Sequence, residues 1–150
     1  MTKWLTTGLS IACAAALGYA YLFYQPAGNA EVIRLAKVAD CQVNQTVCSV
    51  AVDEQHTVAV TIQPFNAKPM EKLALEVHGQ DINSASITID GINMAMPGFP
   101  VKLSAAENNL FTGETSLGLC GQSDMQWQAS VTVNIAGTAY LIPFIFTTTS

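Results

Sequence analysis

Sulfur-bearing side chains gather in two short stretches of the chain, where they could together bind a soft metal ion. Met94 and Met96 stand one residue apart after an Asp-Gly turn signal, and Cys120 lies shortly before Met125. If residues 94–96 are extended, both thioethers point to one side, with their Cα atoms roughly 6.8 Å apart. Thiolate and thioether sulfurs select copper(I) over harder ions. The pattern therefore predicts a copper(I) site built from Met94, Met96, Cys120 and Met125.

The same residues also fit a purely structural interpretation. Methionine is a common filler of irregular gaps in a core, and a Met-x-Met pair on the inner face of a strand needs no metal. Met125 next to Trp127 in the alternating pattern fits sulfur–aromatic packing. A sulfur set without carboxylates disfavours zinc, calcium and magnesium. The choice therefore lies between copper(I) binding and core packing.

The two histidines are weaker candidates for metal binding, and no catalytic motif is present. His56 has the inward parity of Val58, whereas His78 has the outward parity beside Gly79. We expect His56 and His78 to be accessory ligands at most. The sequence contains no G-x-S-x-G, H-E-x-x-H or P-loop motif, and Cys120 has no C-x-x-C partner. The chain is therefore not expected to be an enzyme.

Three cysteines lie beyond the N-terminal region: Cys41, Cys48 and Cys120. Cys41 and Cys48 flank a polar turn, and across such a hairpin they could reach the usual Cα separation of about 5.5 Å. Closing this loop stabilises the fold by about 2–3 kcal/mol in the chain-entropy model. Pairing of either cysteine with Cys120 is also open. In each case one thiol is left over for a ligand, a redox role or an intermolecular bond.

An uncharged, mostly apolar stretch over residues 4–24 follows Lys3 and is long enough to cross a bilayer as a helix. Lys3 favours a cytoplasmic N-terminus, and aromatic residues crowd the far end, as at an outer interface. We expect a single-pass anchor over 1–24, a linker over 25–30 and a C-terminal domain over 31–150 in the periplasm, at the bacterial inner membrane. The alternatives are a signal peptide cleaved near 28–30 and a lipoprotein lipidated at Cys13.

Beyond residue 30, apolar and polar residues alternate. The alternating runs are 58–62, 73–77, 87–89 and 127–135. A period of two indicates strands with one buried face, and short turn signals between them favour antiparallel pairing. The fold predicted is all-β: an immunoglobulin-like antiparallel β-sandwich of seven or eight strands. The last strand, 139–147, is apolar on both parities, which favours a central position, whereas Pro143 favours a bulge or an edge.

The charge balance excludes one class of partner. The chain has 150 residues, six Lys+Arg and a net charge of −5. Nucleic-acid binding relies on clustered cations, so no nucleic-acid partner is expected. Half of the residues are hydrophobic and 11% are charged, which is typical of a packed domain rather than a disordered chain.

The order of these features resembles a known group of proteins. The chain runs from an anchor to Cys41…Cys48, then Asp90-Gly91-Ile92-Asn93-Met94-Ala95-Met96, Cys120…Met125-Gln126-Trp127 and Pro143-Phe144-Ile145-Phe146. This order is similar to that of small membrane-anchored YtkA/FixH-like bacterial proteins, of the kind encoded near Sco/SenC-type copper proteins.

The resemblance implies an immunoglobulin-like sandwich that binds copper(I), with a membrane oxidase or copper protein as its partner in cytochrome oxidase assembly. Met94, Met96, Cys120 and Met125 match the motif positions. The chain departs from the better-known periplasmic copper chaperones because no histidine accompanies its methionine pair. Without a metal, the same domain would be an interaction or assembly module that docks on a membrane protein complex.

Overall fold

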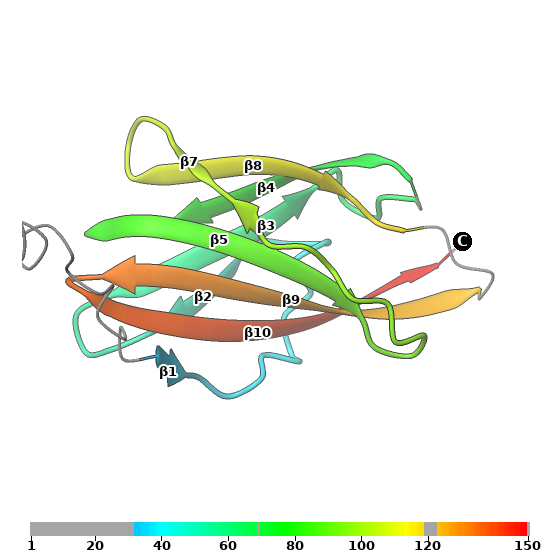
Figure 1. Cartoon of the computed structure of the whole chain (residues 1–150), viewed down its shortest axis with the longest axis horizontal. Helices are drawn as coiled ribbons and strands as arrows, with labels where there is room; N and C mark the ends of the chain where they lie inside the picture. Colours follow the sequence, from blue (N-terminus) through cyan, green and yellow to red (C-terminus); the bar gives the residue numbers. More distant parts are fainter. Residues whose placement is uncertain (1–31, 69, 119–122, 150) are drawn as a thin grey trace, which may run out of the picture. The chain divides into compact units, whose positions relative to one another are not determined.

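The computed structural model describes residues 32–68, 70–118 and 123–149, and within these ranges the chain forms ten β-strands and no helix (Figure 1). The strands are β1 (Val32–Arg34), β2 (Cys48–Ala51), β3 (Thr57–Gln63), β4 (Lys72–His78), β5 (Ile82–Gly91), β6 (Val101–Lys102), β7 (Ser104–Ala105), β8 (Leu110–Ser116), β9 (Asp124–Ile135) and β10 (Thr138–Thr149). The all-β prediction is confirmed. The strands beyond the expected seven or eight are β1, β6 and β7, which have two or three residues each and are too short to show alternation.

The strands form two five-stranded sheets that pack as a β-sandwich. The strand order is β1-β10-β9-β5-β6 in one sheet and β2-β3-β4-β8-β7 in the other. All neighbouring pairs are antiparallel except β1 and β10. The segment through β6 and β7 crosses between the layers, because β6 pairs with β5 and β7 pairs with β8.

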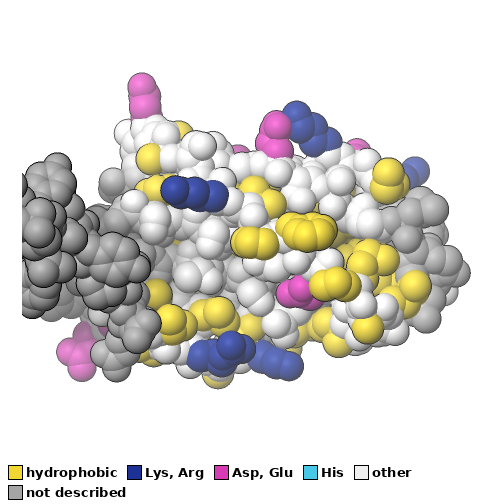
Figure 2. Space-filling view, in the orientation of Figure 1, with side chains coloured by type: hydrophobic (Ala, Val, Ile, Leu, Met, Phe, Trp, Pro, Cys, Tyr) yellow, Lys and Arg dark blue, Asp and Glu magenta, His cyan; other side chains and the backbone are white. Residues whose placement is uncertain are grey.

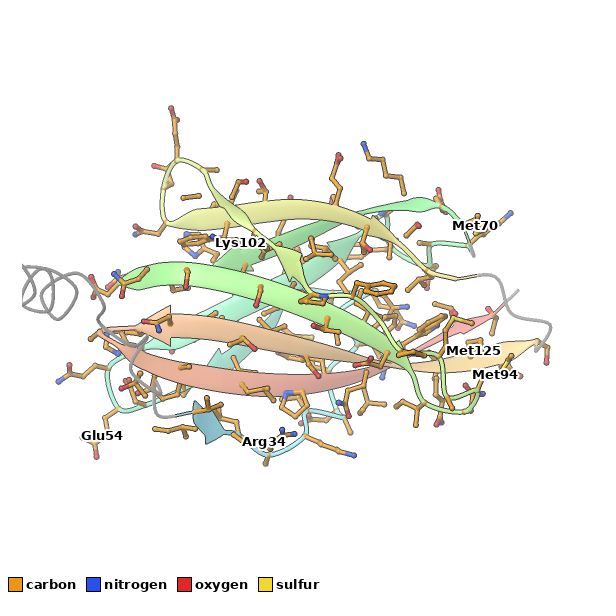
Figure 3. The ribbon with its side chains drawn as sticks, in the orientation of Figure 1. Arg34, Glu54, Met70, Met94, Lys102 and Met125 are labelled. Atoms are coloured by element: carbon orange, nitrogen blue, oxygen red, sulfur yellow. A yellow bond between two sulfur atoms is a disulfide. The ribbon has the colours of Figure 1, made fainter. Side chains whose placement is uncertain are left out.

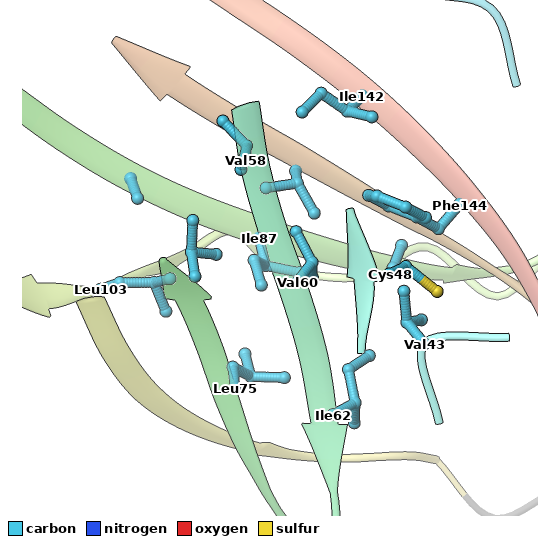
Figure 4. Packing of buried hydrophobic residues seen from close by; sticks show 14 of the residues in the cluster. Val43, Cys48, Val58, Val60, Ile62, Leu75, Ile87, Leu103, Ile142 and Phe144 are labelled. Atoms are coloured by element: carbon cyan, nitrogen blue, oxygen red, sulfur yellow. The ribbon is translucent and has the colours of Figure 1, made fainter. Parts of the chain in front are cut away.

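Alternation along the strands directs one apolar face of each sheet into the core. β3 buries Val58, Val60 and Ile62, and β9 buries every second residue from 125 to 135. Figure 4 shows side chains of both sheets meeting between the layers, with Phe144 of β10 among them. Burying one large aliphatic or aromatic side chain contributes about 1.5–3 kcal/mol, so these alternating positions hold the two sheets together.

β10 lies one place from the edge of its sheet, and this position accommodates Pro143. β9 pairs with β10 along its whole length. On the other side of β10, the Val38 N–H donates to the Pro143 carbonyl at 2.9 Å, and the Ile145 N–H donates to the Val38 carbonyl at 3.0 Å. Since the N–H and C=O of one strand residue point to the same side, the nitrogen of Pro143 faces this outer segment. Because the proline nitrogen does not face β9, no backbone hydrogen bond between β9 and β10 is lost at Pro143.

The two ends of the sandwich carry different residues. β5 runs from Ile82, which pairs with Ile135, to Gly91, which pairs with Trp127, and this length is about 30 Å at the usual strand rise. We call the end formed by residues 91–98, 117–118 and 124–127 the methionine end. We call the opposite end, where β1 pairs with residues 139–141 of β10, the β1 end.

The predicted anchor over 4–24 and the linker over 25–30 lie outside the described residues. The sandwich belongs to a compact unit over Glu31–Ser150. In the part of the chain that the structure describes, no helix has the length and apolarity to cross a bilayer. The anchor therefore stays a prediction.

Candidate functional site

The turn after β5 carries the Met-x-Met pair. The Gly91 N–H donates to the Met96 carbonyl at 2.8 Å, and the Met96 N–H donates to the Gly91 carbonyl at 3.2 Å. Between them, Ala95 adopts a left-handed conformation with φ of 46°. The extended conformation considered for residues 94–96 is not adopted, because these residues close a tight turn.

Asn93 joins this turn to the start of β9. Its side-chain amide donates to the Asp124 carbonyl at 2.9 Å and accepts from the Gln126 N–H at 3.1 Å. The Ile92 N–H also donates to the Gln126 carbonyl at 2.8 Å. A side chain that satisfies backbone groups in this way replaces regular strand pairing. The turn is thereby held next to the strand that carries Met125.

Met96 and Met125 converge on Gly91. A Cβ atom at Gly91 would lie 3.0 Å from the Met96 Cβ and 3.3 Å from the Met125 methyl carbon, with the Trp127 ring 3.5 Å away. The sulfur of Met96 lies beside Gly118, 2.5 Å from the point where a Cβ of that residue would stand. Two of the predicted ligands are therefore neighbours, and the two glycines leave room for them.

Water reaches the predicted sulfur ligands to different extents. Met94, near the tip of the turn, is 40% exposed, Met96 is half-buried, and Met125 is 3% exposed. Figure 3 shows Met94 and Met125 at the same end of the sandwich. Cys120 lies outside the described residues, so its part in the site stays a prediction.

A further methionine, Met70, reaches the methionine end from the turn between β3 and β4 (Figure 3). Its backbone N–H donates to the Leu117 carbonyl at 3.1 Å, and its side chain is 64% exposed. Sequence reasoning missed Met70, because no motif connects it with the other methionines. The pairing of β4 with β8, with Lys72 opposite Ser116, brings it to this end.

An apolar cavity of about 230 Å³ opens beside Met96, between the two sheets. Ile89 and Trp127 line it from one sheet, and Leu117 lines it next to the other. Phe99 also lines the cavity and is 87% exposed. Figure 2 shows hydrophobic side chains concentrated on this part of the visible face. Such a surface can take up a nonpolar group of a partner.

The histidines do not join the sulfur residues. His56 lies at the β1 end, where its Nδ1–H donates to the Asp53 carboxylate at 2.8 Å and its Nε2 lies 3.6 Å from the Asp81 carboxylate. The Tyr140 hydroxyl donates to Asp53 at 3.1 Å, which links the turn between β2 and β3 to β10 of the other sheet. His78 is exposed at the end of β4.

These contacts favour the charged forms of Asp53 and His56. The Gln55 backbone N–H, followed by the His56 ring, lowers the pKa of Asp53 from its ordinary value of 3.8 to about 2. The hydrogen bond to Asp53 in turn raises the pKa of His56 above its ordinary value of 6.5. A metal needs the neutral imidazole, so His56 is a poor ligand here. Within 32–68, 70–118 and 123–149, no group of three His, Cys, Asp or Glu is placed to hold a metal.

Cys41 and Cys48 form a disulfide, with their Sγ atoms 2.01 Å apart and their Cα atoms 5.8 Å apart. Cys48 is buried in the core, and Cys41 packs half-buried against it. The predicted pair is therefore at bonding distance. Since a metal takes the thiolate form of cysteine, neither sulfur of the pair is available to a metal.

The methionine end gathers neutral sulfur donors from several segments of the chain. Thioethers carry no charge and no proton, and they favour soft ions. The apolar cavity beside them offers a second property, the binding of nonpolar groups. Compared with known proteins, the chain matches no protein family and no curated protein.

Proposed function

We propose that this chain is a non-enzymatic, membrane-tethered protein of the periplasm that binds copper(I) through methionine thioethers and delivers it in cytochrome oxidase assembly. One observation carries the proposal: four of the five methionines of the chain lie at one end of the sandwich. Met94 and Met70 are well exposed there. Core filling accounts for Met125, but it gives no reason for exposed thioethers in the same place.

The proposed ligands are Met94, Met96, Cys120 and Met125. Copper(I) is the ion that thioether and thiolate donors prefer. A thioether has no proton to lose, so the methionines would keep their affinity in acid, whereas a cysteine ligand would make binding depend on pH. The pH dependence of copper(I) affinity therefore measures how much Cys120 contributes to copper(I) binding.

The proposed architecture is an immunoglobulin-like sandwich behind a single-pass anchor over residues 4–24. Val32, the first described residue, pairs with Ala139 at the β1 end. The chain thus enters the sandwich at the end opposite to the methionines. A tether raises the effective concentration of the site near a membrane partner. The resemblance to YtkA/FixH-like proteins suggests a membrane oxidase or copper protein as that partner.

A copper(I) competition titration tests the proposal. The full-length chain in detergent is titrated under anaerobic, reducing conditions against a chromophoric copper(I) chelator. We expect stoichiometric binding that Met94→Leu/Met96→Leu weakens at least about tenfold, because removing a residue that only supports a ligand already costs about 10–100-fold and these residues are the proposed ligands. Leucine keeps the volume of methionine, so the fold is retained. Phe65→Leu, which alters an exposed side chain of the turn between β3 and β4, is the control.

The outcomes separate copper binding from packing. Binding that the methionine variant loses and the control keeps supports a copper carrier, and Cys120→Ser then reports the thiol contribution. If the intact chain fails to compete with the chelator, the methionines serve packing only, and the copper proposal is wrong.

A second candidate is a metal-free assembly module that docks on a membrane protein complex. The observation that favours it is Phe99, which is 87% exposed beside the apolar cavity. A photo-crosslinking residue placed at position 99 in cells is expected to capture a subunit of a membrane complex. The same residue placed at His78, exposed on β4, is the control. Equal labelling from both positions would argue against this candidate.

A further inference from the structure

We infer that Met70 belongs to the metal site and forms a thioether pair with Met96 across the backbone of Leu117 and Gly118. This inference rests on the proposed copper(I) site and adds a ligand that the sequence motifs do not contain. It concerns the soft monovalent ions copper(I) and silver(I), which thioethers prefer.

Met70 and Met96 approach the same dipeptide. The Met70 N–H donates to the Leu117 carbonyl at 3.1 Å. The Met96 sulfur lies 2.5 Å from the point where a Cβ of Gly118 would stand. The path from the Met70 nitrogen through the Leu117 carbonyl and Gly118 to the Met96 sulfur limits their separation to about 10 Å. The flexible Met70 side chain, with a metal ion between the two sulfurs, can span that distance.

The local structure of Met70 gives no other reason for a methionine at this position. Its φ of 66° is in the left-handed region, which residues with a Cβ rarely adopt. Its side chain is 64% exposed and so does little packing. A glycine would suit this backbone and a polar side chain would suit this exposure. Binding of a soft metal ion explains why a thioether stands at position 70.

Gly118 keeps the space between the two methionines open. A Cβ atom there would be 2.5 Å from the Met96 sulfur and 3.4 Å from its methyl carbon. Met96 would therefore have to turn away if residue 118 carried a side chain. The absence of a Cβ leaves the sulfur of Met96 next to the segment that holds Met70.

Methyl NMR of the full-length chain in detergent tests the pair directly. Methionine is labelled with carbon-13 at its methyl group, the resonances are assigned with single Met→Leu variants, and silver(I) is the probe. We expect the Met70 and Met96 resonances to shift with one common midpoint. Met70→Leu should weaken silver(I) binding about tenfold, whereas Phe65→Leu in the same turn should leave the affinity unchanged.

Three results would contradict the Met70–Met96 pair, and they differ in whether the proposed copper(I) site remains supported. If Met94 and Met96 shift while Met70 does not, Met70 is not a ligand and the proposed copper site remains. If Met70 responds identically in the Met96→Leu variant, it binds silver(I) alone and the pair is wrong. If no methionine resonance responds, the proposed copper site fails together with the pair.

Discussion

Replacing Gly98 with alanine is expected to destabilise the sandwich strongly. A Cβ atom at this position would stand 2.1 Å from the Ile89 carbonyl oxygen and 2.7 Å from its carbonyl carbon. Both atoms belong to the backbone of β5, and Ile89 is paired with Ala129 of β9. They cannot rotate away as a side chain does. The segment around Gly98 must therefore move outward by about 1 Å to restore a normal contact.

That movement also breaks a hydrogen bond. The Gly98 N–H donates to the Asp90 carboxylate at 2.8 Å, and a stretch of about 1 Å exceeds the hydrogen-bond range. Overpacking costs about 1–3 kcal/mol, and a hydrogen bond to a charged group contributes about 1.5–3 kcal/mol. Water recovers part of the second contribution, because Asp90 is only half-buried. We expect the free energy of unfolding to fall by about 2–4 kcal/mol, which a domain of typical stability survives.

Urea unfolding of the full-length chain, followed by the fluorescence of the buried Trp127, measures this loss as a lower midpoint at unchanged slope. Gly113→Ala is the matched control, because its Cβ would meet the tip of the Leu103 side chain at 2.5 Å. This side chain can shift, so we expect a loss at the lower end of the overpacking range, about 1 kcal/mol. If Gly98→Ala proves no more destabilised than Gly113→Ala, the close packing of residue 98 on β5 is refuted.

Three further predictions concern the domain. Cys41→Ala/Cys48→Ala opens a loop whose ends are seven residues apart, and urea unfolding should show a free energy of unfolding lower by about 2–3 kcal/mol. An unfolding midpoint that is unchanged both in this variant and in the reduced wild-type chain would contradict this prediction. Phe144→Ala leaves a cavity in the fully buried core and should lower the free energy of unfolding by about 3–5 kcal/mol. Asp53→Asn should lower the melting temperature most between about pH 4 and 6.5, because Asp53, with its lowered pKa, contributes stability above 3.8 that is lost towards pH 2. His56, with its raised pKa, contributes stability below 6.5 that is lost as the pH rises through that raised value; a melting-temperature difference independent of pH would contradict the pairing.

Sequence reasoning succeeds here where the physical cause is local. Val58, Val60 and Ile62 are two residues apart, and all three are buried because every second side chain of a strand points to the same face. Cys41 and Cys48 are close along the chain, so a single turn suffices to bring them to bonding distance. The Asp90-Gly91 signal likewise marks a turn, although that turn bends the Met-x-Met pair instead of extending it.

Residues far apart in the chain are brought together or kept apart by strand pairing. His56 shares the inward parity of Val58, yet it lies at the β1 end, where Asp53 and Asp81 hold it. β3, which begins after His56, runs from the β1 end to the methionine end, and β4 runs back to the β1 end, so His56 and the methionines lie at opposite ends of β3. Parity reports the face of a strand and contains no information about which end of the sandwich a residue reaches.

Alternation and turn residues by themselves determined the longer strands and their buried faces, because each depends on interactions within a few residues. Cysteine spacing allowed the Cys41–Cys48 pair and left pairing with Cys120 open. The tertiary structure alone decided that the Met70 N–H donates to Leu117, in the segment next to Met96, and that the nitrogen of Pro143 points away from β9. Both depend on the order β10-β9-β5 and on the pairing of β4 with β8. The strand order is the one that buries the apolar faces of all the strands together, and a pattern within a few residues contains no information about that total burial.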